Sequence, residues 1–455
     1  MGEPSPMTYP LPEERVEQRL ADKKPLLTDA EARAEAERCL YCVDAPCTRA
    51  CPTEIDVPGF IKKIASGNVR GSAKTIFAQN ILGESCSRVC PVEVLCVGAC
   101  VYNGWHRQPI AIGRLQRYAT ETATAPSERP LLTPKARAAS GPPKRVACIG
   151  AGPASLACAA YLALEGHKAV VYEKGAFPGG LNTTGIAPYK LHADEAIAEV
   201  EWVRGLGVEV RTGVEVAVSA DGPGTVTLQS LLEAHDALFL GLGLGSDTKL
   251  GIPGEDGPGV IGATAWIEEM KLSRARHHEA IPGRVLVIGG GNTAIDVARE
   301  LTQLGAEDVA LVYRRGAGDM SGYDHEMDGA RREGVRLIPN SVPLAFLRDP
   351  SGRLVGLRVA MAENGQPIAG TEHDLACDRV AVAIGQSKLR SLAAALPGVR
   401  LDARGCVIVD RTTLATGHPK VWSGGDCING GKEVVNAVAD GRDAARAMLR
   451  AWGVA

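Results

Sequence analysis

Eight of the 13 cysteines in the chain lie between Cys39 and Cys100, in two groups of four. The first group is Cys39-x2-Cys42-x4-Cys47-x3-Cys51-Pro52, and the second is Cys86-x3-Cys90-Pro91-x4-Cys96-x3-Cys100. A secreted, disulfide-bonded protein would spread its cysteines along the chain and carry an apolar signal sequence, and this sequence shows neither feature. The clustered cysteines therefore predict metal ligands in a reducing compartment, so we expect a cytoplasmic protein.

The spacing of the thiols bears on which metal they bind. Closely spaced thiolates can surround one inorganic cluster, and a Cys-Pro pair is common where the chain crosses to a second cluster. A structural zinc site also uses four thiolates, but it usually presents two C-x2-C pairs. The spacings here are irregular, and each group contains a Cys-Pro pair. The pattern favours iron–sulfur clusters, with structural zinc as the alternative.

Composition excludes several other classes of protein. The chain has 455 residues, 45% of them hydrophobic and 23% charged, which is typical of a globular protein of about three domains. A net charge of −3 argues against nucleic-acid binding. No window approaches the roughly 18 apolar residues of a membrane span. The 53 glycines and 4% aromatic residues fit nucleotide-binding α/β units better than an all-β chain.

A first glycine-rich unit follows an apolar run over residues 144–150. The run ends in Gly150-Ala151-Gly152-Pro153-Ala154-Ser155, a version of the dinucleotide-binding fingerprint. Gly150 permits the tight turn, Gly152 lets the backbone approach a pyrophosphate, and Ser155 is small enough for close packing of helix on strand. The next predicted strand, AVVYEK, ends in Glu173 and Lys174, where a carboxylate can bind ribose hydroxyls.

A second unit of the same kind begins about 140 residues later, over residues 284–294. Its glycine turn contains Gly289 and Gly291, followed by Asn292 and Thr293. The next predicted strand, VALVYRR, ends in Arg314 and Arg315 rather than in an acid. Basic residues at this position suit the 2′-phosphate of NADPH, whereas a solvated strand end would explain them equally simply. NADPH is therefore favoured, and NADH stays open.

These motifs occur in an order that resembles a known family. The ordered pieces are the eight-cysteine region, Gly150–Ser155, Gly179-Gly180-Leu181, Gly289-Gly290-Gly291-Asn292 and Val421-Trp-Ser-Gly-Gly-Asp426. Together they resemble the N-terminal half of dihydropyrimidine dehydrogenase, its bacterial subunit equivalent, and the small subunit of NADPH-dependent glutamate synthase. The resemblance covers nearly the whole chain. It implies an α/β fold with an N-terminal α-helical iron–sulfur domain and two Rossmann-like domains, the NAD(P)H domain being inserted in the FAD domain.

The resemblance also implies cofactors and domain boundaries. We expect FAD and two [4Fe–4S] clusters as cofactors, with NADPH or NADH as substrate. The expected divisions are a double-cluster domain at 1–122, a linker at 123–143, the two parts of the FAD domain at 144–262 and 372–455, and the NAD(P)H domain at 263–371. Within the first of these, Thr28 is expected to begin a helix, and helical runs are expected in VPGFIKKIASGN and GSAKTIFAQN.

A ligand set for the two clusters follows from the resemblance. It assigns one cluster to Cys39, Cys42, Cys47 and Cys100. The other cluster would be held by Cys51, Cys90 and Cys96 with Gln116 as its fourth ligand, so Cys86 would not be a ligand. The glutamate synthase branch would carry a glutamate at the position of Gln116, which favours the dihydropyrimidine dehydrogenase branch.

The C-terminal part resembles the flavoprotein signature of the family. Gly425 and Asp426 would contact the ribityl chain or the pyrophosphate, and Glu433 and Val434 would lead into a helix whose N-terminus faces the flavin. That helix dipole would stabilise negative charge on the reduced flavin. The list of expected cofactor contacts is completed by Gly180, Leu181 and Gly385. Two segments depart from the family pattern: residues 318–321 add Asp319 and no third basic residue, and residues 182–192 match only loosely.

These features predict a subunit that passes electrons between NAD(P)H and a partner protein. Hydride transfer to flavin needs stacking and exclusion of water, so we expect no catalytic side chain. The partner would be an FMN-containing dihydropyrimidine dehydrogenase subunit, a glutamate synthase large subunit, or another iron–sulfur oxidoreductase acting on a 2-oxoacid or aldehyde, with electrons then flowing toward NAD+. A stand-alone NAD(P)H–ferredoxin oxidoreductase and a purely structural scaffold are the alternatives.

Overall fold

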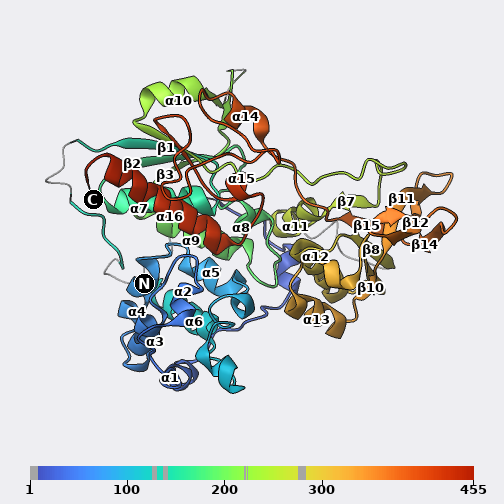
Figure 1. Ribbon diagram of the computed structural model, residues 1–455, viewed down its shortest axis with the longest axis horizontal. Helices are drawn as coiled ribbons and strands as arrows, with labels where there is room; N and C mark the ends of the chain where they lie inside the picture. Colours follow the sequence, from blue (N-terminus) through green and yellow to red (C-terminus); the bar gives the residue numbers. More distant parts are fainter. Residues whose placement is uncertain are drawn as a thin grey trace.

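The computed structural model describes residues 9–124, 131–136, 142–219, 222, 224–274 and 283–454. These residues form a helical N-terminal unit and two units built on parallel sheets (Figure 1). Of the predicted linker 123–143, residues 125–130 and 137–141 lie outside this description. No helix within the described ranges has the length and the apolar character needed to cross a membrane.

The N-terminal unit consists of short helices that local sequence signals start and stop. Thr28 begins the first helix with a capping box, in which its hydroxyl accepts from the Glu31 N–H at 3.3 Å and the Glu31 carboxylate accepts from the Thr28 N–H at 2.8 Å. Asp56 and Asn68 cap the helices Val57–Ala65 and Val69–Phe77. The elements are η1 (Val16–Arg19), α1 (Asp29–Glu37), α2 (Pro46–Arg49), α3 (Val57–Ala65), α4 (Val69–Phe77), α5 (Gly83–Val89), η2 (Val92–Val94), η3 (Val101–Trp105) and α6 (Ile112–Thr124).

The first sheet unit contains a five-stranded parallel sheet of order β16-β6-β1-β2-β3. Two of its helices, α7 and α16, cross in close contact, because Gly441 has no side chain and a Cβ there would lie 2.0 Å from the Ala154 carbonyl. The elements are β1 (Arg145–Ile149), α7 (Pro153–Leu164), β2 (Lys168–Tyr172), α8 (Leu181–Thr184), α9 (Ala193–Arg204), β3 (Glu209–Arg211), β4 (Glu215–Ala217), β5 (Thr225–Thr227), α10 (Leu228–Ala234), β6 (Ala237–Leu240), α14 (Arg390–Ala394), β16 (Val421–Ser423), α15 (Asp426–Asn429) and α16 (Val434–Ala451).

The second sheet unit has a parallel sheet of order β10-β9-β8-β15-β7. One face packs on a small antiparallel sheet through a core that includes Leu286, Ile288, Phe346 and Leu357, and helices contribute the other core of this unit. The elements are β7 (Val260–Gly262), α11 (Ala263–Leu272), β8 (Arg284–Ile288), α12 (Asn292–Gln303), β9 (Asp308–Val312), η5 (Ala317–Asp319), α13 (Asp324–Arg332), β10 (Arg336–Ile338), β11 (Ser341–Arg348), β12 (Leu354–Glu363), β13 (Gln366–Pro367), β14 (His373–Ala376) and β15 (Arg379–Val382).

The sheet pairing places two strands, β7 and β15, in a different unit from the one that the sequence predicts. Strands β7 and β15, placed by sequence in the two parts of the FAD domain, hydrogen-bond to each other, and β15 also pairs with β8. The second sheet unit therefore runs from β7 to β15, with described residues 260–274 and 283–382, and the predicted NAD(P)H domain, 263–371, falls within these limits. An apolar run predicts a buried strand, but it carries no information about which of two parallel sheets the strand joins.

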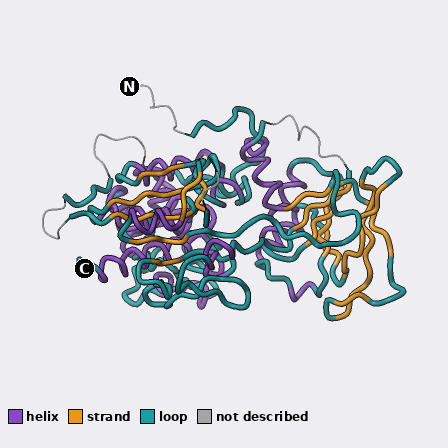
Figure 2. Tube along the Cα trace, turned by 90° about the horizontal axis from the view of Figure 1, so that it is seen from above, coloured by secondary structure: helices purple, strands orange, loops and turns teal. Residues whose placement is uncertain are grey.

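Two connections join the sheet units, and they lie side by side. Gly245 N–H donates to Ser387 O and Thr248 N–H donates to Gly385 O, both at 2.8 Å. Figure 2 shows loop segments running between the two bodies of the molecule. The second unit is thus an insertion in the first, because the chain leaves the first sheet after β6 and returns to it at β16.

The N-terminal strap, residues 9–24, contacts all three units of the fold. Val16 and Leu20 are buried in the core of the second sheet unit, in the same cluster as Tyr189 of the first. The Glu17 carboxylate accepts from the Ala193 N–H at the start of α9, at 3.0 Å. The strap then enters the helical unit, so it contacts all three parts of the fold.

Candidate functional site

The first glycine turn lies at the carboxyl end of β1. Gly150 has φ +88°, and a Cβ there would lie 2.5 Å from the Gly241 carbonyl, so only glycine fits. Gly152 begins α7, with Pro153 in its first turn, and a Cβ at Gly152 would meet nothing within 4 Å. Gly180, with φ +55°, packs its backbone against Gly152 and begins α8 at Leu181. The turn therefore leaves open space at a helix N-terminus, which fits a dinucleotide pyrophosphate.

Glu173 and Ser155 complete this turn. The Glu173 carboxylate follows β2 and accepts from the N–H groups of Ala151 and Gly175, both at 2.8 Å. These bonds fix the carboxylate beside the glycine turn, with lone pairs still available for ribose hydroxyls. Ser155 is fully buried. Its Oγ lies so close to Gly241 that a Cβ at position 241 would collide with it. Lys174 is exposed next to Glu173.

The C-terminal signature reaches the same end of the first sheet. A Cβ at Gly425, which follows β16, would lie 3.0 Å from the Ala154 Cβ of α7. The Asp440 carboxylate of α16 accepts from the Gly425 N–H at 2.9 Å, and burial raises the pKa of Asp440 to about 6. Asp426 follows directly, and its carboxylate accepts from the Lys432 N–H at 3.0 Å. Glu433 is the N-cap of α16 and Val434 its first residue. The N-terminus of α7 thus packs through Ala154 against Gly425 and against Gly441 of α16.

The second glycine turn repeats this geometry between β8 and α12. A Cβ at Gly289 would lie 2.3 Å from the Ala383 carbonyl, and Gly291 is the N-cap of α12. Asn292 accepts through Oδ1 from the Tyr323 N–H at 2.9 Å, while Thr293 is exposed. Gly385 lies just beyond β15, in the connection between the sheet units.

Arg314 and Arg315 lie where the sequence places them, at the end of β9. Both are exposed, and the Arg315 guanidinium lies over the Tyr313 ring at 5.4 Å from its centroid. The carboxylate of the nearby Asp319 accepts from the Gly316 N–H at 3.2 Å. The site therefore offers two guanidinium groups to a phosphate.

The first group of thiols surrounds an apolar pocket in the helical unit. All four predicted ligands of the first cluster line the pocket, namely Cys39, Cys42, Cys47 and Cys100. Apolar side chains complete the lining, among them Val57, Ile61, Ile110 and Ile112. Burial, with Cys39 and Cys100 nearby, raises the pKa of Cys47 to about 11. Among the described residues, no three His, Cys, Asp or Glu side chains converge tightly enough for a single metal ion. Four thiols around a pocket fit a larger inorganic cluster.

The second group of thiols lies between this pocket and the first sheet unit. Burial and the neighbouring Cys90 and Cys51 thiols raise the pKa of Cys96 well above its ordinary value, so these three predicted ligands lie close together. Gln116 is buried on α6 and donates from Nε2 to the Gly83 carbonyl at 2.7 Å. Cys86 is also buried, and its thiol contacts that of Cys90.

Sequence reasoning missed Tyr323, which lies where the three units meet. Its hydroxyl donates to the Glu433 carboxylate at 2.8 Å, and its N–H is bound by Asn292. Burial and the bond to Glu433, with Cys90 nearby, raise the pKa of Tyr323 to about 12, so the hydroxyl stays protonated. One side chain therefore lies beside the second glycine turn, the N-cap of α16 and a predicted cluster ligand. No local motif marks it in the sequence.

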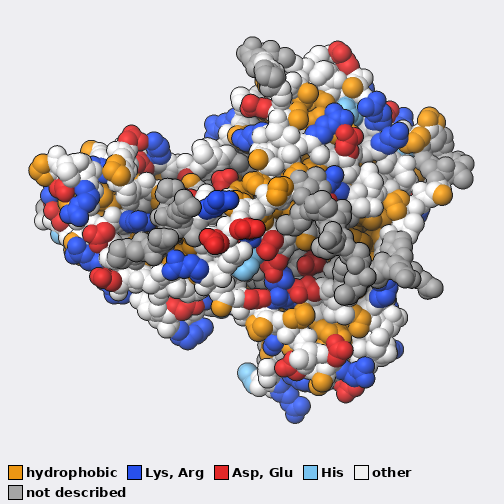
Figure 3. Space-filling view, turned by 180° about the vertical axis from the view of Figure 1, so that it is seen from behind, with side chains coloured by type: hydrophobic (Ala, Val, Ile, Leu, Met, Phe, Trp, Pro, Cys, Tyr) orange, Lys and Arg blue, Asp and Glu red, His pale blue; other side chains and the backbone are white. Residues whose placement is uncertain are grey.

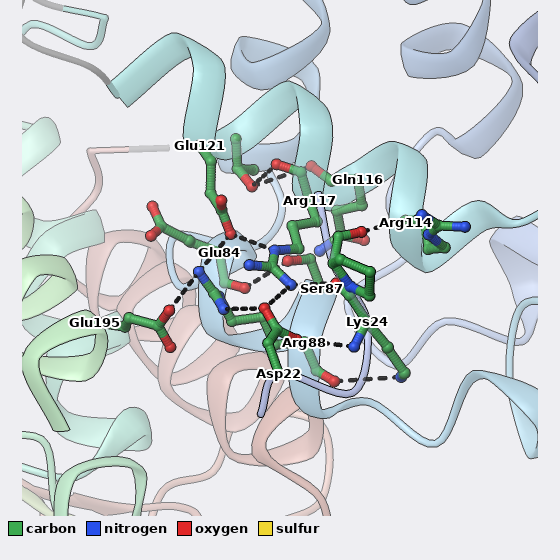
Figure 4. A network of polar contacts seen from close by, with 12 residues as sticks. Asp22, Lys24, Glu84, Ser87, Arg88, Arg114, Gln116, Arg117, Glu121 and Glu195 are labelled. Atoms are coloured by element: carbon green, nitrogen blue, oxygen red, sulfur yellow. Dashed lines mark hydrogen bonds and ion pairs between the residues drawn. The ribbon is translucent and has the colours of Figure 1, made fainter. Parts of the chain in front are cut away.

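Two arginines of the helical unit form a second feature that the sequence did not indicate. Arg88, two residues before Cys90, contacts Glu121 at 2.6 Å and Glu195 of the first sheet unit at 2.7 Å. Arg117, next to Gln116, contacts Asp22 of the strap at 2.6 Å. Figure 4 shows these groups converging around α5 and α6. Two buried arginines, paired with partly exposed carboxylates, thus connect the segment before Cys90 and the helix of Gln116 to the strap and to α9.

The seam between the sheet units is also charged. The Glu326 carboxylate of α13 contacts Lys23 of the strap at 2.8 Å, Arg299 at 2.7 Å and Lys190 at 3.1 Å. Lys190 also contacts Asp296 at 2.7 Å. Figure 3 shows charged side chains of both signs gathered near the centre of the molecule.

Family models match both halves of the chain. Residues 16–128 match a model described as dihydropyrimidine dehydrogenase domain II, 4Fe-4S cluster, and residues 144–441 match pyridine nucleotide-disulphide oxidoreductase. The chain belongs to the pyridine nucleotide-disulphide oxidoreductase family. Within it, the glutamate synthase [NADPH] small chain of Escherichia coli is 33% identical over 443 residues, which cover 93% of this chain and 92% of that protein. The predicted resemblance and the fold class are confirmed.

A second relative is named for a different enzyme. The NADP(+)-dependent formate dehydrogenase subunit beta of Moorella thermoacetica is 33% identical over 436 residues, covering 89% of this chain and 59% of that protein. Among solved structures, thioredoxin reductase of T. acidophilum matches with a TM-score of 0.54 and 19% identity, over 68% of this chain and 99% of that one. At that identity the structural match concerns the fold of the two sheet units alone.

Proposed function

We propose that this chain is an electron-transfer subunit that carries electrons between NADPH and a separate catalytic subunit. When bound, FAD accepts hydride and releases electrons singly, and [4Fe–4S] clusters carry single electrons. The family membership and the 4Fe-4S model over residues 16–128 support this assignment. The observation that carries it is the position of Tyr323, because its contacts bring the second glycine turn, the N-cap of α16 and the second thiol group to one place.

Different sets of residues would bind the FAD, the NADPH and the clusters. Gly150, Gly152 and Gly180 leave room for the FAD pyrophosphate, Glu173 would bind its ribose, and the N-terminus of α16 at Glu433 would face the flavin ring. The turn at Gly291 and the two arginines would bind NADPH. The helical unit would hold the clusters with the ligand set given above. Apolar side chains, among them Val57, Ile61 and Ile112, line the first pocket beside the thiols.

The partner follows from the relatives. We propose a glutamate synthase large subunit or a related FMN-containing reductase as the acceptor. The formate dehydrogenase relative favours a second candidate, in which electrons enter from a partner and reduce NADP+. Both versions place the protein in the cytoplasm, where NADP(H) and reduced thiols are found together.

The test uses the full chain, purified anaerobically. We expect about eight iron atoms and one FAD per chain, given two four-iron clusters and one flavin turn. NADPH should bleach the flavin absorbance and then produce the electron paramagnetic resonance (EPR) signals of reduced clusters. Zinc in place of iron, or about four iron atoms, would contradict the assignment. Proteins that copurify under the same conditions identify the partner and thereby the direction of electron flow.

A further inference from the structure

One peptide group at the start of α5 connects the first sheet unit to Gln116. The N–H of Glu84 donates to the Glu199 carboxylate of α9 at 2.9 Å. The carbonyl of the same peptide belongs to Gly83, and it accepts from the Gln116 Nε2 at 2.7 Å. A continuous chain of hydrogen bonds therefore runs from Glu199 through the Gly83–Glu84 peptide to the side-chain amide of Gln116.

This chain determines which atom of Gln116 is presented to a ligand. A primary amide has donors on nitrogen and lone pairs on oxygen only. Since Nε2 is committed to the Gly83 carbonyl, Oε1 is the atom left to bind iron. Hydrogen bonds in series polarise one another, so the bond at Glu84 strengthens the bond at Gly83. Glu199 and Gln116 are only 4% and 8% exposed, and water therefore competes weakly.

Helix α9 holds α5 at a second point as well. Glu195, one turn before Glu199, contacts Arg88 at 2.7 Å, and Arg88 precedes Cys90 by two residues. Glu199 also accepts from the N–H and the hydroxyl of Ser85. The first sheet unit thus fixes both the peptide that orients Gln116 and the end of α5 that carries Cys90.

We propose that Glu199 is a positioning residue for the second cluster: it fixes the Gly83–Glu84 peptide so that Gln116 presents Oε1 to iron. This inference rests on the ligand set in the proposed function. It gives the first sheet unit a part in building a metal site that lies in the helical unit.

Three variants of the full chain test the inference. Glu199→Asp keeps a carboxyl group but withdraws the acceptor by one methylene. Glu199→Gln keeps an acceptor oxygen at the same reach, and its nitrogen can donate to the Ser85 hydroxyl, which then acts as an acceptor. Ser85→Ala is the matched control, because it removes a Glu199 contact without touching the Gly83–Glu84 peptide. Each protein is reduced with dithionite, and its iron content, EPR spectrum and cluster midpoint potentials are measured.

We expect Glu199→Asp to shift the EPR signal and potential of one cluster, while Glu199→Gln and Ser85→Ala keep both clusters as in the wild type. An unchanged Glu199→Asp protein would overturn the inference, as would equal changes in all three variants or a change confined to Glu199→Gln. If Glu199→Asp does not accumulate as folded protein, Glu199→Gln decides: an unchanged spectrum supports the inference and a changed spectrum overturns it.

A fourth variant separates this inference from the ligand assignment. Gln116→Ala should remove or alter the same cluster signal that Glu199→Asp shifts. If Gln116→Ala leaves both clusters unchanged, the ligand set itself is wrong, and the inference falls with it. If Gln116→Ala alters a cluster but Glu199→Asp does not, the ligand set stands and only the role of Glu199 is refuted.

Discussion

Replacing Glu326 by glutamine should loosen the seam between the units in a strongly pH-dependent way. The Glu326 carboxylate contacts three cations, one from the strap and two from the sheet units. Its side chain is only 10% exposed, so solvent screens these contacts weakly. Glutamine keeps the shape and removes the charge, which leaves Lys23, Lys190 and Arg299 facing one another.

The magnitude follows from the pKa of Glu326. Burial alone would raise this pKa, but Lys190 and Lys23 outweigh burial and lower it to about 2 from an ordinary 4.5. A difference of about 2.5 pKa units at about 1.4 kcal/mol each corresponds to roughly 3 kcal/mol of stabilisation at neutral pH. That is within the range expected when one partner of a buried ion pair is removed.

The sign of the pH dependence is fixed by the direction of the shift. Because the folded-state pKa is depressed, the stabilisation is complete above pH 4.5 and is lost as the pH falls toward 2. Calorimetric melting of wild type and Glu326→Gln should therefore differ by a constant amount between pH 7 and pH 5.5. The difference should shrink below about pH 4.5, as the wild-type carboxylate loses its advantage over the unfolded state.

Asp328→Asn is the matched control, since Asp328 lies on the same helix but is 56% exposed and pairs with Arg331. An exposed pair of this kind contributes about 0–1 kcal/mol. If Glu326→Gln melts like Asp328→Asn at pH 7, or if its deficit does not shrink in acid, the ion pairs of Glu326 at the seam do not stabilise the fold.

Three further outcomes are expected. Arg315→Ala should raise the Michaelis constant for NADPH about ten- to a hundredfold and leave that for NADH unchanged, because a charge-assisted bond contributes roughly 1.5–3 kcal/mol. Arg336→Ala is the control and should change neither constant, because the Arg336 guanidinium is already paired with Asp308. A wild type that strongly prefers NADH would contradict this prediction. Cys51→Ser should leave flavin bleaching by NADPH and dye reduction near wild type but abolish turnover with the partner, and turnover that survives would mean that electrons leave by another route. Cys86→Ser should keep about eight iron atoms per chain, and loss of a cluster would make Cys86 a ligand.

Local features of the fold could be read from the sequence because they depend on neighbouring residues. The capping box at Thr28 lies within four residues, and each glycine turn lies between one strand and one helix. The four thiols that line the first pocket were grouped by resemblance alone, since Cys100 lies far along the chain from Cys39, Cys42 and Cys47. Spacing alone would have grouped Cys100 with Cys86, Cys90 and Cys96.

Contacts between distant segments could not be read in this way. The partners of β7 and β15 depend on which sheet has a free edge, and the apolar runs look alike in both cases. Tyr323, Glu326 and Glu199 carry no motif, because their roles arise from the packing of three units rather than from spacing along the chain. The antiparallel strands β11 to β14 alternate too weakly in burial to have been predicted as a covering layer.

The same helix, α9, explains why the three units form one electron carrier rather than three joined domains. Its first residue is bound by Glu17 of the strap, while Glu195 and Glu199 contact the helix that carries Cys90. The segment just before it supplies Lys190 to the seam with the second sheet unit. Since electron transfer depends steeply on distance, the positions of flavin, nicotinamide and second cluster must be fixed together. Residues 190–199 contact the strap, the helical unit and the second sheet unit. The first sheet unit therefore fixes the positions of the other two units relative to each other.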